Sequence, residues 1–232
     1  MQRWWLDEHA HAGDENLDAT YVAGYERKQG FDPTEDVEAL RSYGLRPDST
    51  LVDLGAGTGV LALAVAPLCR RVIAVDVSPV MTAAIRDRID AYELENVTVV
   101  DAGFLSYEYD GEPVDFVYTR NALHQLPDFW KAIALDRMAG LLRPGGILRL
   151  RDLVFDFDPA EAEAHIEAWM AGAVTDSSVG YTAEELAEHV RGEFSTYSWL
   201  LDRMLDRTGF DVTERSFRRA AYGTYTCRRR DL

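Results

Sequence analysis

The sequence is poor in residues that hold small folds together through covalent cross-links or metal ions. Only two of its 232 residues are cysteines, Cys69 and Cys227, and neither belongs to a CxxC motif or to a cluster of cysteine and histidine. We therefore expect neither a disulfide framework nor a structural zinc site. The fold has to rest on its apolar residues, which make up 47% of the chain and are enough for a full core.

Long apolar runs are also missing. The longest is Val60–Leu68, which Pro67 interrupts, and it is far shorter than the ~20 residues that cross a bilayer. The segment Met1–Glu8 has two tryptophans but no basic region followed by an apolar one, so it does not resemble a signal peptide. We expect no membrane partner and a cytoplasmic protein.

Lysine is scarce, and acidic residues are in large excess. Lys28 and Lys131 are the only lysines among 24 basic residues, which face 40 acidic ones and leave a net charge of −16. Such a surface repels nucleic acid at long range, so direct nucleic-acid binding is not favoured. A halophilic origin is a competing explanation, because high salt screens the self-repulsion of an acidic surface. It predicts that folding improves in molar KCl.

Most of the chain alternates short apolar strands with helices. The expected strands are Thr50–Leu54, Arg71–Val77, Val97–Val100, Val114–Thr119 and Ile147–Leu153, and the expected helices are Val37–Tyr43, Val60–Leu68, Met81–Tyr92 and Phe129–Leu142. Such alternation predicts a parallel sheet wound with helices on both faces. The nearly uniform apolarity of the first two strands indicates that both of their sides are buried.

The C-terminal part departs from this rhythm. Three helices are expected in a row, at Pro159–Ala173, Thr182–Val190 and Ser195–Thr208. The segments Phe210–Phe217 and Ala221–Cys227 then read as two strands with no helix between them, which requires an antiparallel pair. The predicted fold class is α/β, with a doubly wound, mostly parallel sheet of seven strands that ends in an antiparallel C-terminal hairpin.

The strongest motif is a glycine turn after the first strand, Leu51-Val-Asp-Leu-Gly-Ala-Gly-Thr-Gly59. Glycine at alternate positions permits positive φ angles and lets a ligand or a neighbouring helix approach the backbone closely. The helix that starts directly afterwards offers free N–H groups. The turn therefore predicts a ligand site, with the candidate binding residues Asp53, Gly55, Ala56, Gly57 and Gly59.

A second signal is the acidic residue at the tip of the second strand. Asp76, followed by Val77, lies 19 residues after Gly57 and would sit beside the glycine turn. A carboxylate there can accept both hydrogen bonds of a ribose diol. The alternative is a helix N-cap, although Ser78 fits that role better. These two signals alone also fit a nicotinamide-dependent dehydrogenase.

Three later segments decide between these interpretations. They are Asp101-Ala102 at the end of the third strand, Asp115–Leu126 around the fourth, and Leu142–Ile147 leading into the fifth. With the glycine turn, they make the chain resemble the class I S-adenosylmethionine-dependent methyltransferases in their small type 11/type 25 form. The resemblance covers residues 35–155 well and extends more loosely to 232. It implies a Rossmann-like sheet of strand order 3-2-1-4-5-7-6, with strand 7 antiparallel.

The resemblance also implies how the chain holds S-adenosylmethionine as its cofactor. Asp53 and the glycine turn would line the methionine part, and Asp76 would hold the ribose hydroxyls. Asp101 would accept a hydrogen bond from the adenine amino group, and the Ala102 N–H would meet the ring.

Two residues at the exit of the fourth strand are candidates for the reacting end. By the resemblance, Asn121 would help to position the sulfonium. His124 is the candidate catalytic residue, because a neutral imidazole there could remove a proton from the acceptor. Many family members carry two adjacent histidines at this place, whereas here the second is Gln125, so a packing role against the cofactor is the alternative. At the exit of the fourth strand, Thr119–Ala122 stands in place of Asn-Pro-Pro-Tyr, which argues against an exocyclic base amine or a glutamine amide as the acceptor.

The segments outside the cofactor-binding half, residues 35–153, are expected to shape the acceptor site of this single domain. Residues 1–34, the lid segment, are rich in aromatic and imidazole groups, and Tyr21 and Tyr25 would share a helix face, from which Tyr25 could contact a sulfonium. The alternative is an apolar staple for the first helix. His9 and His11 have no evident third ligand, so no metal site is expected. Residues 154–194, the insert, would form the acceptor pocket. Residues 195–232 would form the last helix and the antiparallel hairpin.

The predicted function is methyl transfer from S-adenosylmethionine to an acceptor, with a small molecule as the first choice. The alternative acceptor is tRNA or a translation protein, reached with a small activator subunit. Such a partner could pair with Val97–Val100, which would be an uncharged sheet edge unless the loop around Glu108–Pro113 covers it. A cofactor-binding regulator or scaffold without catalysis is the alternative of another class.

Overall fold

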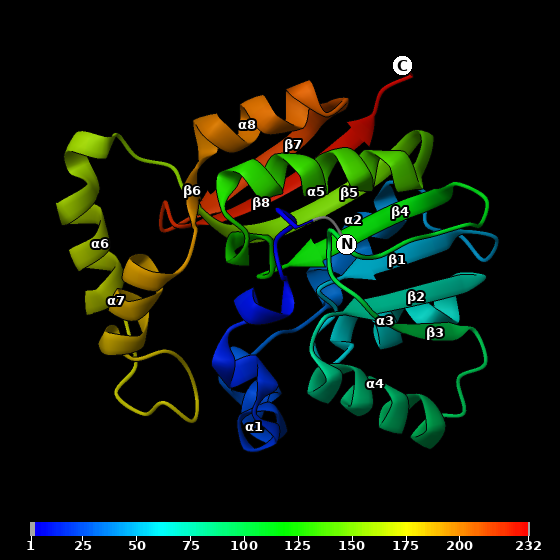
Figure 1. Ribbon diagram of the computed structural model, residues 1–232, viewed down its shortest axis with the longest axis horizontal. Coiled ribbons are helices and arrows are strands. Elements are labelled where there is room, and N and C mark those ends of the chain that lie inside the picture. The colour runs from blue at the N-terminus through cyan, green and yellow to red at the C-terminus, as the bar shows by residue number, and fades with distance from the viewer. Residues whose placement is uncertain (1–2, 232) are drawn as a thin grey trace.

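A twisted sheet runs through the protein and carries helices on both faces (Figure 1). The computed structural model describes residues 3–231, and the order of the long strands in this part is β3-β2-β1-β4-β5-β8-β7. Their bounds are β1 (Thr50–Leu54), β2 (Arg71–Asp76), β3 (Val97–Asp101), β4 (Val114–Arg120), β5 (Leu142–Phe155), β7 (Phe210–Arg218) and β8 (Tyr222–Arg229). The short β6 (Thr196–Tyr197) lies off this path and pairs with the end of β5.

The predicted strand directions are confirmed. β1 to β5 pair in parallel, and β8 is antiparallel to both β5 and β7. The expected bounds of β5 were too short, because the strand begins at Leu142 rather than Ile147. Val114 pairs with Leu142 across an irregularity in the β4–β5 ladder, so the segment before Ile147 joins the sheet despite its proline and two glycines.

Side chains of each central strand alternate between two cores. In β1, Val52 and Leu54 pack into one core, and Leu51 packs into the other, as the two-residue period of a strand requires. α5 (Asp128–Leu141) and α8 (Ser198–Arg207) cover the first face, and α5 lies in front of the sheet in Figure 1. α2 (Thr34–Ser42), α3 (Val60–Val65) and α4 (Pro79–Ala91) cover the opposite face.

The helices at the carboxyl ends of the parallel strands come from the lid segment and the insert. The lid segment contributes η1 (His9–His11), η2 (Asp14–Leu17) and α1 (Ala19–Gln29), and the insert contributes η5 (Pro159–Glu161), α6 (Ala162–Ala171) and α7 (Ala183–Gly192). In Figure 1, α6 and α7 stand to the left of the sheet and α1 lies beneath it. Two short turns, η3 (Ala66–Leu68) and η4 (Leu123–Gln125), complete the described helices.

Local sequence sets where these helices start. An ion pair also joins the lid segment to the insert. The Asp18 side chain accepts hydrogen bonds from the first N–H groups of α1, and Thr182 and Glu185 form a reciprocal capping box on α7. Lys28 of α1 pairs with Glu185 at 2.5 Å. Within residues 3–231, no helix combines the length and the apolar composition needed to cross a lipid bilayer.

Candidate functional site

Three adjoining hollows open where the parallel strands end. The first lies on the glycine turn, and the second extends from it past Asp76 toward the end of β3. The third is a cavity of ≈ 890 Å³ between the lid segment and the insert. Tyr25, Arg120 and Asn121 line all three, so they stand at the junction of the hollows.

Backbone geometry shapes the glycine turn. The N–H groups of Gly55 and Ala56 both donate to the Val75 carbonyl of β2, at 2.9 and 3.0 Å. Gly55 has φ +71°, and a Cβ on it would stand 2.4 Å from the Ala122 Cβ, so no larger residue fits this turn without movement. Gly57, at φ +55°, leaves room before the Tyr25 ring, which a Cβ would approach to 3.6 Å. Asp53, Gly55, Ala56 and Gly57 line the hollow, and their predicted contact with a cofactor stays a prediction.

Gly59 has a packing role between two helices. It begins α3 with φ +82°, and a Cβ there would lie 3.1 Å from the Ile85 side chain of α4. It does not line either of the two smaller hollows. The structure therefore places Gly59 where two helices pack closely, while its predicted cofactor contact stays a prediction.

Asp76 sits beside the glycine turn. Its Oδ2 accepts the Gly57 N–H at 2.8 Å, and its Oδ1 accepts the Ser78 N–H at 2.9 Å. Burial raises the pKa of Asp76 to about 6, although these backbone hydrogen bonds oppose the rise. Each oxygen has a further lone pair, so the carboxylate could accept the predicted hydrogen bonds from the two hydroxyl groups of a ribose.

Asp53 is the deeper acid of the site. Its side chain is buried beneath the first hollow, and burial together with the negative charge of Asp76 raises its pKa to about 8. It is therefore mostly protonated at neutral pH in the free protein, which gives it a proton to donate as well as oxygens that accept.

The far end of the second hollow differs from the predicted arrangement. Asp101 does not line it, because its carboxylate turns to Thr82 at 2.5 Å and Arg86 at 2.7 Å. Ala102 does line it, but its N–H donates to the Asp76 carbonyl at 3.0 Å and is not free for a ring. Val77, a predicted cofactor-binding residue, also lines this hollow, as do Glu8, Met81 and Phe104, which were not predicted to lie there.

Glu8 shows how the lid segment is fastened. Its Oε1 accepts the Leu105 N–H and its Oε2 accepts the Ser106 N–H, both at 2.9 Å. Burial raises the pKa of Glu8 against these hydrogen bonds. The segment before α1 is thus bonded to the loop after β3, and both sides of the second hollow are held together.

Tyr25 and Asn121 occupy the junction of the hollows. Tyr21 and Tyr25 share one face of α1, as their spacing predicted, with ring centroids 6.1 Å apart. Burial raises the pKa of Tyr25 well above its usual value, so its hydroxyl stays protonated. Asn121 adopts φ +48°, a conformation that asparagine tolerates better than most residues, and its N–H donates to the Arg151 carbonyl at 2.9 Å.

His124 lies in η4 at the wall of the large cavity, buried among acids. Its Nδ1 contacts Asp152 Oδ1, and its Nε2 lies 3.1 Å from Glu193 Oε2. Burial lowers the pKa of His124, but the charge and hydrogen bond of Asp152 and then Glu193 outweigh it and raise the pKa to about 10. The ring is therefore protonated in the free protein at neutral pH. His189 of α7 also contacts Glu193, so the structure assembles a cluster that the sequence analysis did not predict.

The large cavity has a mixed lining. Aromatic rings come from the lid segment, the insert and β8. Basic and acidic side chains both line the cavity: Lys28, Arg120, Arg151 and Arg218, and Glu15, Glu35, Asp152, Glu185, Glu188 and Glu193. Its principal side chains are Tyr21, Tyr25, Arg120, Arg151, Trp169, Tyr181 and Tyr222. His11 also lines it, 6.0 Å from the Phe194 ring, whereas Trp4 and Trp5 pack on Trp130 of α5 instead.

Comparisons with known proteins agree with this arrangement. A family model described as a methyltransferase domain matches residues 51–146. An uncharacterised methyltransferase of Exiguobacterium sibiricum is 31% identical over 176 residues, or 76% of this chain and 75% of that protein. Another, of Anoxybacillus flavithermus, is 27% identical over 213 residues, or 92% of each chain. A chain from the complex between the Haloferax volcanii Trm112 methyltransferase activator and a methyltransferase is 15% identical and superposes with a TM-score of 0.68, covering 94% of this chain and 98% of that one.

Proposed function

Because the chain belongs to the class I S-adenosylmethionine-dependent methyltransferases, we propose that it methylates a small molecule held in the large cavity. The observation that carries this proposal is the junction of the hollows. Tyr25, Arg120 and Asn121 border the large cavity and also the first and second hollows, which we call the cofactor-type hollows. An acceptor in the cavity would therefore share a boundary with the cofactor. A cavity of ≈ 890 Å³ lies in the size range of small-molecule sites.

The chain's own residues would hold the cofactor at its ribose, its methionine end and its base. Asp76 would accept from the ribose hydroxyls, and Asp53 would face the methionine end. Ala102 and Phe104 offer an apolar slot for the base. When bound, S-adenosylmethionine supplies an activated methyl group, which passes to the acceptor nucleophile as its carbon–sulfur bond breaks. The Tyr25 ring, at the junction, would face the sulfonium by cation–π attraction.

The acceptor would be a compact molecule with polar groups. Arg120 and Arg151 bring positive charge to the cavity, and Trp169, Tyr181 and Tyr222 bring aromatic surface. Positioning acceptor and methyl group in line supplies much of the rate acceleration of a displacement. Proton removal by His124 stays a prediction. It requires that the ring first lose the proton that Asp152 and Glu193 stabilise in the free protein.

Calorimetric titration with S-adenosylmethionine and S-adenosylhomocysteine, at low and high KCl, tests the cofactor half of this proposal. We expect micromolar binding that is lost in Asp76→Ala, and incorporation of labelled methyl groups into a low-molecular-mass fraction of a native extract. Absence of binding in every condition would overturn the proposal. Binding without labelling of any fraction would instead support a cofactor-binding regulator or scaffold.

A macromolecular acceptor, reached through an activator subunit, is the second candidate. β3 lies at the edge of the sheet and, among the described strands, pairs with β2 alone. Its exposed edge carries no charge over Val97–Val100, and a small protein could add a strand there. The solved Haloferax volcanii structure contains a methyltransferase with its activator. Labelling of tRNA or of a translation protein, lost when a lysine replaces the exposed Thr98 (Thr98→Lys) and charges the edge, would favour this candidate.

A further inference from the structure

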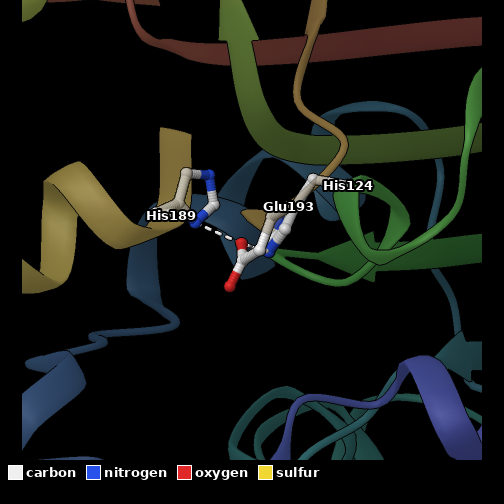
Figure 2. Close-up of side chains that lie close together, drawn as sticks. All are labelled: His124, His189 and Glu193. Atoms are coloured by element: carbon white, nitrogen blue, oxygen red, sulfur yellow. Dashed lines mark ion pairs between the residues drawn. The ribbon is translucent and has the colours of Figure 1, made fainter. Parts of the chain in front are cut away.

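A cluster of three potential metal ligands lies in the wall of the large cavity, and none of the three lines the first or second hollow. His124 of η4, His189 of α7 and Glu193, just after α7, each offer one ligand atom, and these atoms lie within 4.8 Å of one another. Figure 2 shows the Glu193 carboxylate against the His189 ring, with the His124 ring on its other side. Adjacent ligands of a zinc ion lie roughly 3.4 Å apart, so small side-chain movements would bring all three into range.

Each imidazole is oriented by a partner on its other nitrogen. His124 Nδ1 contacts Asp152 Oδ1, and His189 Nε2 lies 2.8 Å from Ser195 Oγ. The remaining nitrogens, His124 Nε2 and His189 Nδ1, both point to Glu193. Metal-bound histidines are held in this way, because the outer hydrogen bond fixes the ring orientation and leaves the other nitrogen free for the ion.

Glu193 provides the second observation. Its Oε2 is buried and, within residues 3–231, has no aligned hydrogen-bond donor, although two ring nitrogens lie beside it. Contacts that are close but not aligned are expected when lone pairs from three groups converge on one point. A metal ion would have to displace the proton that Asp152 and Glu193 hold on the His124 ring. Once both rings are neutral, the carboxylates of Asp152 and Glu193 give the cluster two negative charges, which match a divalent cation.

We propose that His124, His189 and Glu193 bind a divalent first-row transition metal such as Zn²⁺ or Fe²⁺. Two imidazole nitrogens and one carboxylate oxygen are a common ligand set for these ions, with further coordination positions left open. The Gln125 amide, whose Nε2 lies 3.2 Å from His124 Nε2, would rotate aside or turn its oxygen to the ion.

The open positions would face the acceptor cavity, which all three ligands line. Resting here on the proposed function, we infer that the ion would bind an oxygen or sulfur of the acceptor and favour its deprotonated form. His124 would then act as a ligand, and the proton of the acceptor would be lost to solvent rather than to this ring.

Metal binding can be measured without cofactor or acceptor, so it is independent of the proposed function. The full chain, freed of metal by chelation, is titrated with Co²⁺ by visible absorption and with Zn²⁺ by calorimetry. We expect one ion per chain and ligand-field bands of a nitrogen–oxygen site. His189→Asn and Glu193→Gln should each weaken Co²⁺ binding by at least about 100-fold, and Asp152→Asn by about 10- to 100-fold.

The matched control is the exposed His165–Glu161 pair, in which the nearest atoms lie 3.9 Å apart. His165→Asn removes a histidine beside a glutamate and should leave the Co²⁺ spectrum and affinity unchanged. Circular dichroism of every variant separates lost binding from lost folding. No binding of either ion at millimolar concentration, or equal binding by wild type and both ligand variants, would overturn the proposal and leave the cluster as an ion-pair network.

Discussion

The protein keeps two sets of buried or partly buried carboxylates in opposite electrostatic surroundings. Asp53 and Asp76, under the cofactor-type hollows, have no ion pair among the described residues, and burial raises the pKa of Asp53 to about 8 and of Asp76 to about 6. In the second set, Asp36 is bonded to arginines, and Glu193, at the large cavity, touches two imidazoles. Burial raises the pKa of Glu193, but its contacts with the two imidazoles hold it well below the usual range.

The difference follows from what each region is made to hold. A neutral or singly charged acid among backbone N–H groups can exchange hydrogen bonds with hydroxyl and amino groups of a ligand. A carboxylate that is already paired with arginine or histidine instead fixes the shape and charge of a wall. The unpaired set lines the two hollows of the proposed cofactor site. In the paired set, Glu193 lines the large cavity, and Asp36 pairs with Arg151, which lines it.

The largest expected effect is on the paired set. Asp36 is 0% exposed, accepts from Tyr118 Oη at 2.9 Å and lies 3.1 Å from Arg149 Nε. Asp36→Asn leaves the buried Arg149 guanidinium with only the more distant Glu35, 3.8 Å away, and the loss of a partner costs about 3–5 kcal/mol in comparable pairs. Urea denaturation at neutral pH should show this loss. The exposed Asp48→Asn, whose pair with Arg46 is at the surface, should change stability by less than about 0.5 kcal/mol.

The second prediction distinguishes the roles of Asp76 and Asp101, the acids at the ends of the neighbouring strands β2 and β3. Asp76→Asn removes charge from an acceptor of hydroxyl groups, and hydrogen bonds to charged groups are worth about 1.5–3 kcal/mol. Affinity for S-adenosylmethionine should fall by roughly 100-fold, measured by calorimetry. Asp101→Asn should have little effect, because Thr82 and Arg86 hold that carboxylate outside the hollow. A large loss in Asp101→Asn would show that this acid turns inward and contacts the cofactor.

The fold could be predicted closely because its signals are local. The strand bounds Thr50–Leu54 agree with the prediction, and the antiparallel C-terminal pair followed from two strands with no helix between them. The early start of β5 could not be predicted, since Pro144 and two glycines normally end a strand. Only the partner Val114 makes that pairing favourable.

The candidate site also has one part that the sequence predicts and another that only tertiary packing brings together. The turn at Gly57 and the acid at Asp76 are visible in sequence, because backbone conformation and strand ends place them. The contact of Glu8 with Ser106 spans 98 positions, and His124 meets Asp152 over 28. No periodicity encodes such pairs, since tertiary packing alone brings them together.

The third prediction concerns Asp53 and pH. Its folded-state pKa of about 8 lies above the unfolded value, so the native state binds an extra proton between roughly pH 4 and 8. Its contribution to stability is therefore present in acid and is lost as pH rises through this window. Relative to Asp53→Asn, the wild type should lose about 1.4 kcal/mol of unfolding free energy per pH unit between pH 5 and 7. Urea midpoints of both proteins across this range give the difference, and parallel curves would contradict the raised pKa.

The smallest effect is expected from the third set of acids, those on the surface. The net charge of −16 makes exposed carboxylates repel one another, and salt shortens the range of this repulsion from about 10 Å at 0.1 M to about 3 Å at 1 M. KCl should therefore raise the unfolding free energy by on the order of 1 kcal/mol, mostly below molar concentration. The gain should persist in Asp53→Asn, because that acid is buried and far less screened by salt. Lower stability or loss of helical signal in molar KCl would contradict the halophilic interpretation. A gain that grows linearly well beyond 1 M would assign the effect to general exclusion of salt from the protein surface instead of screening.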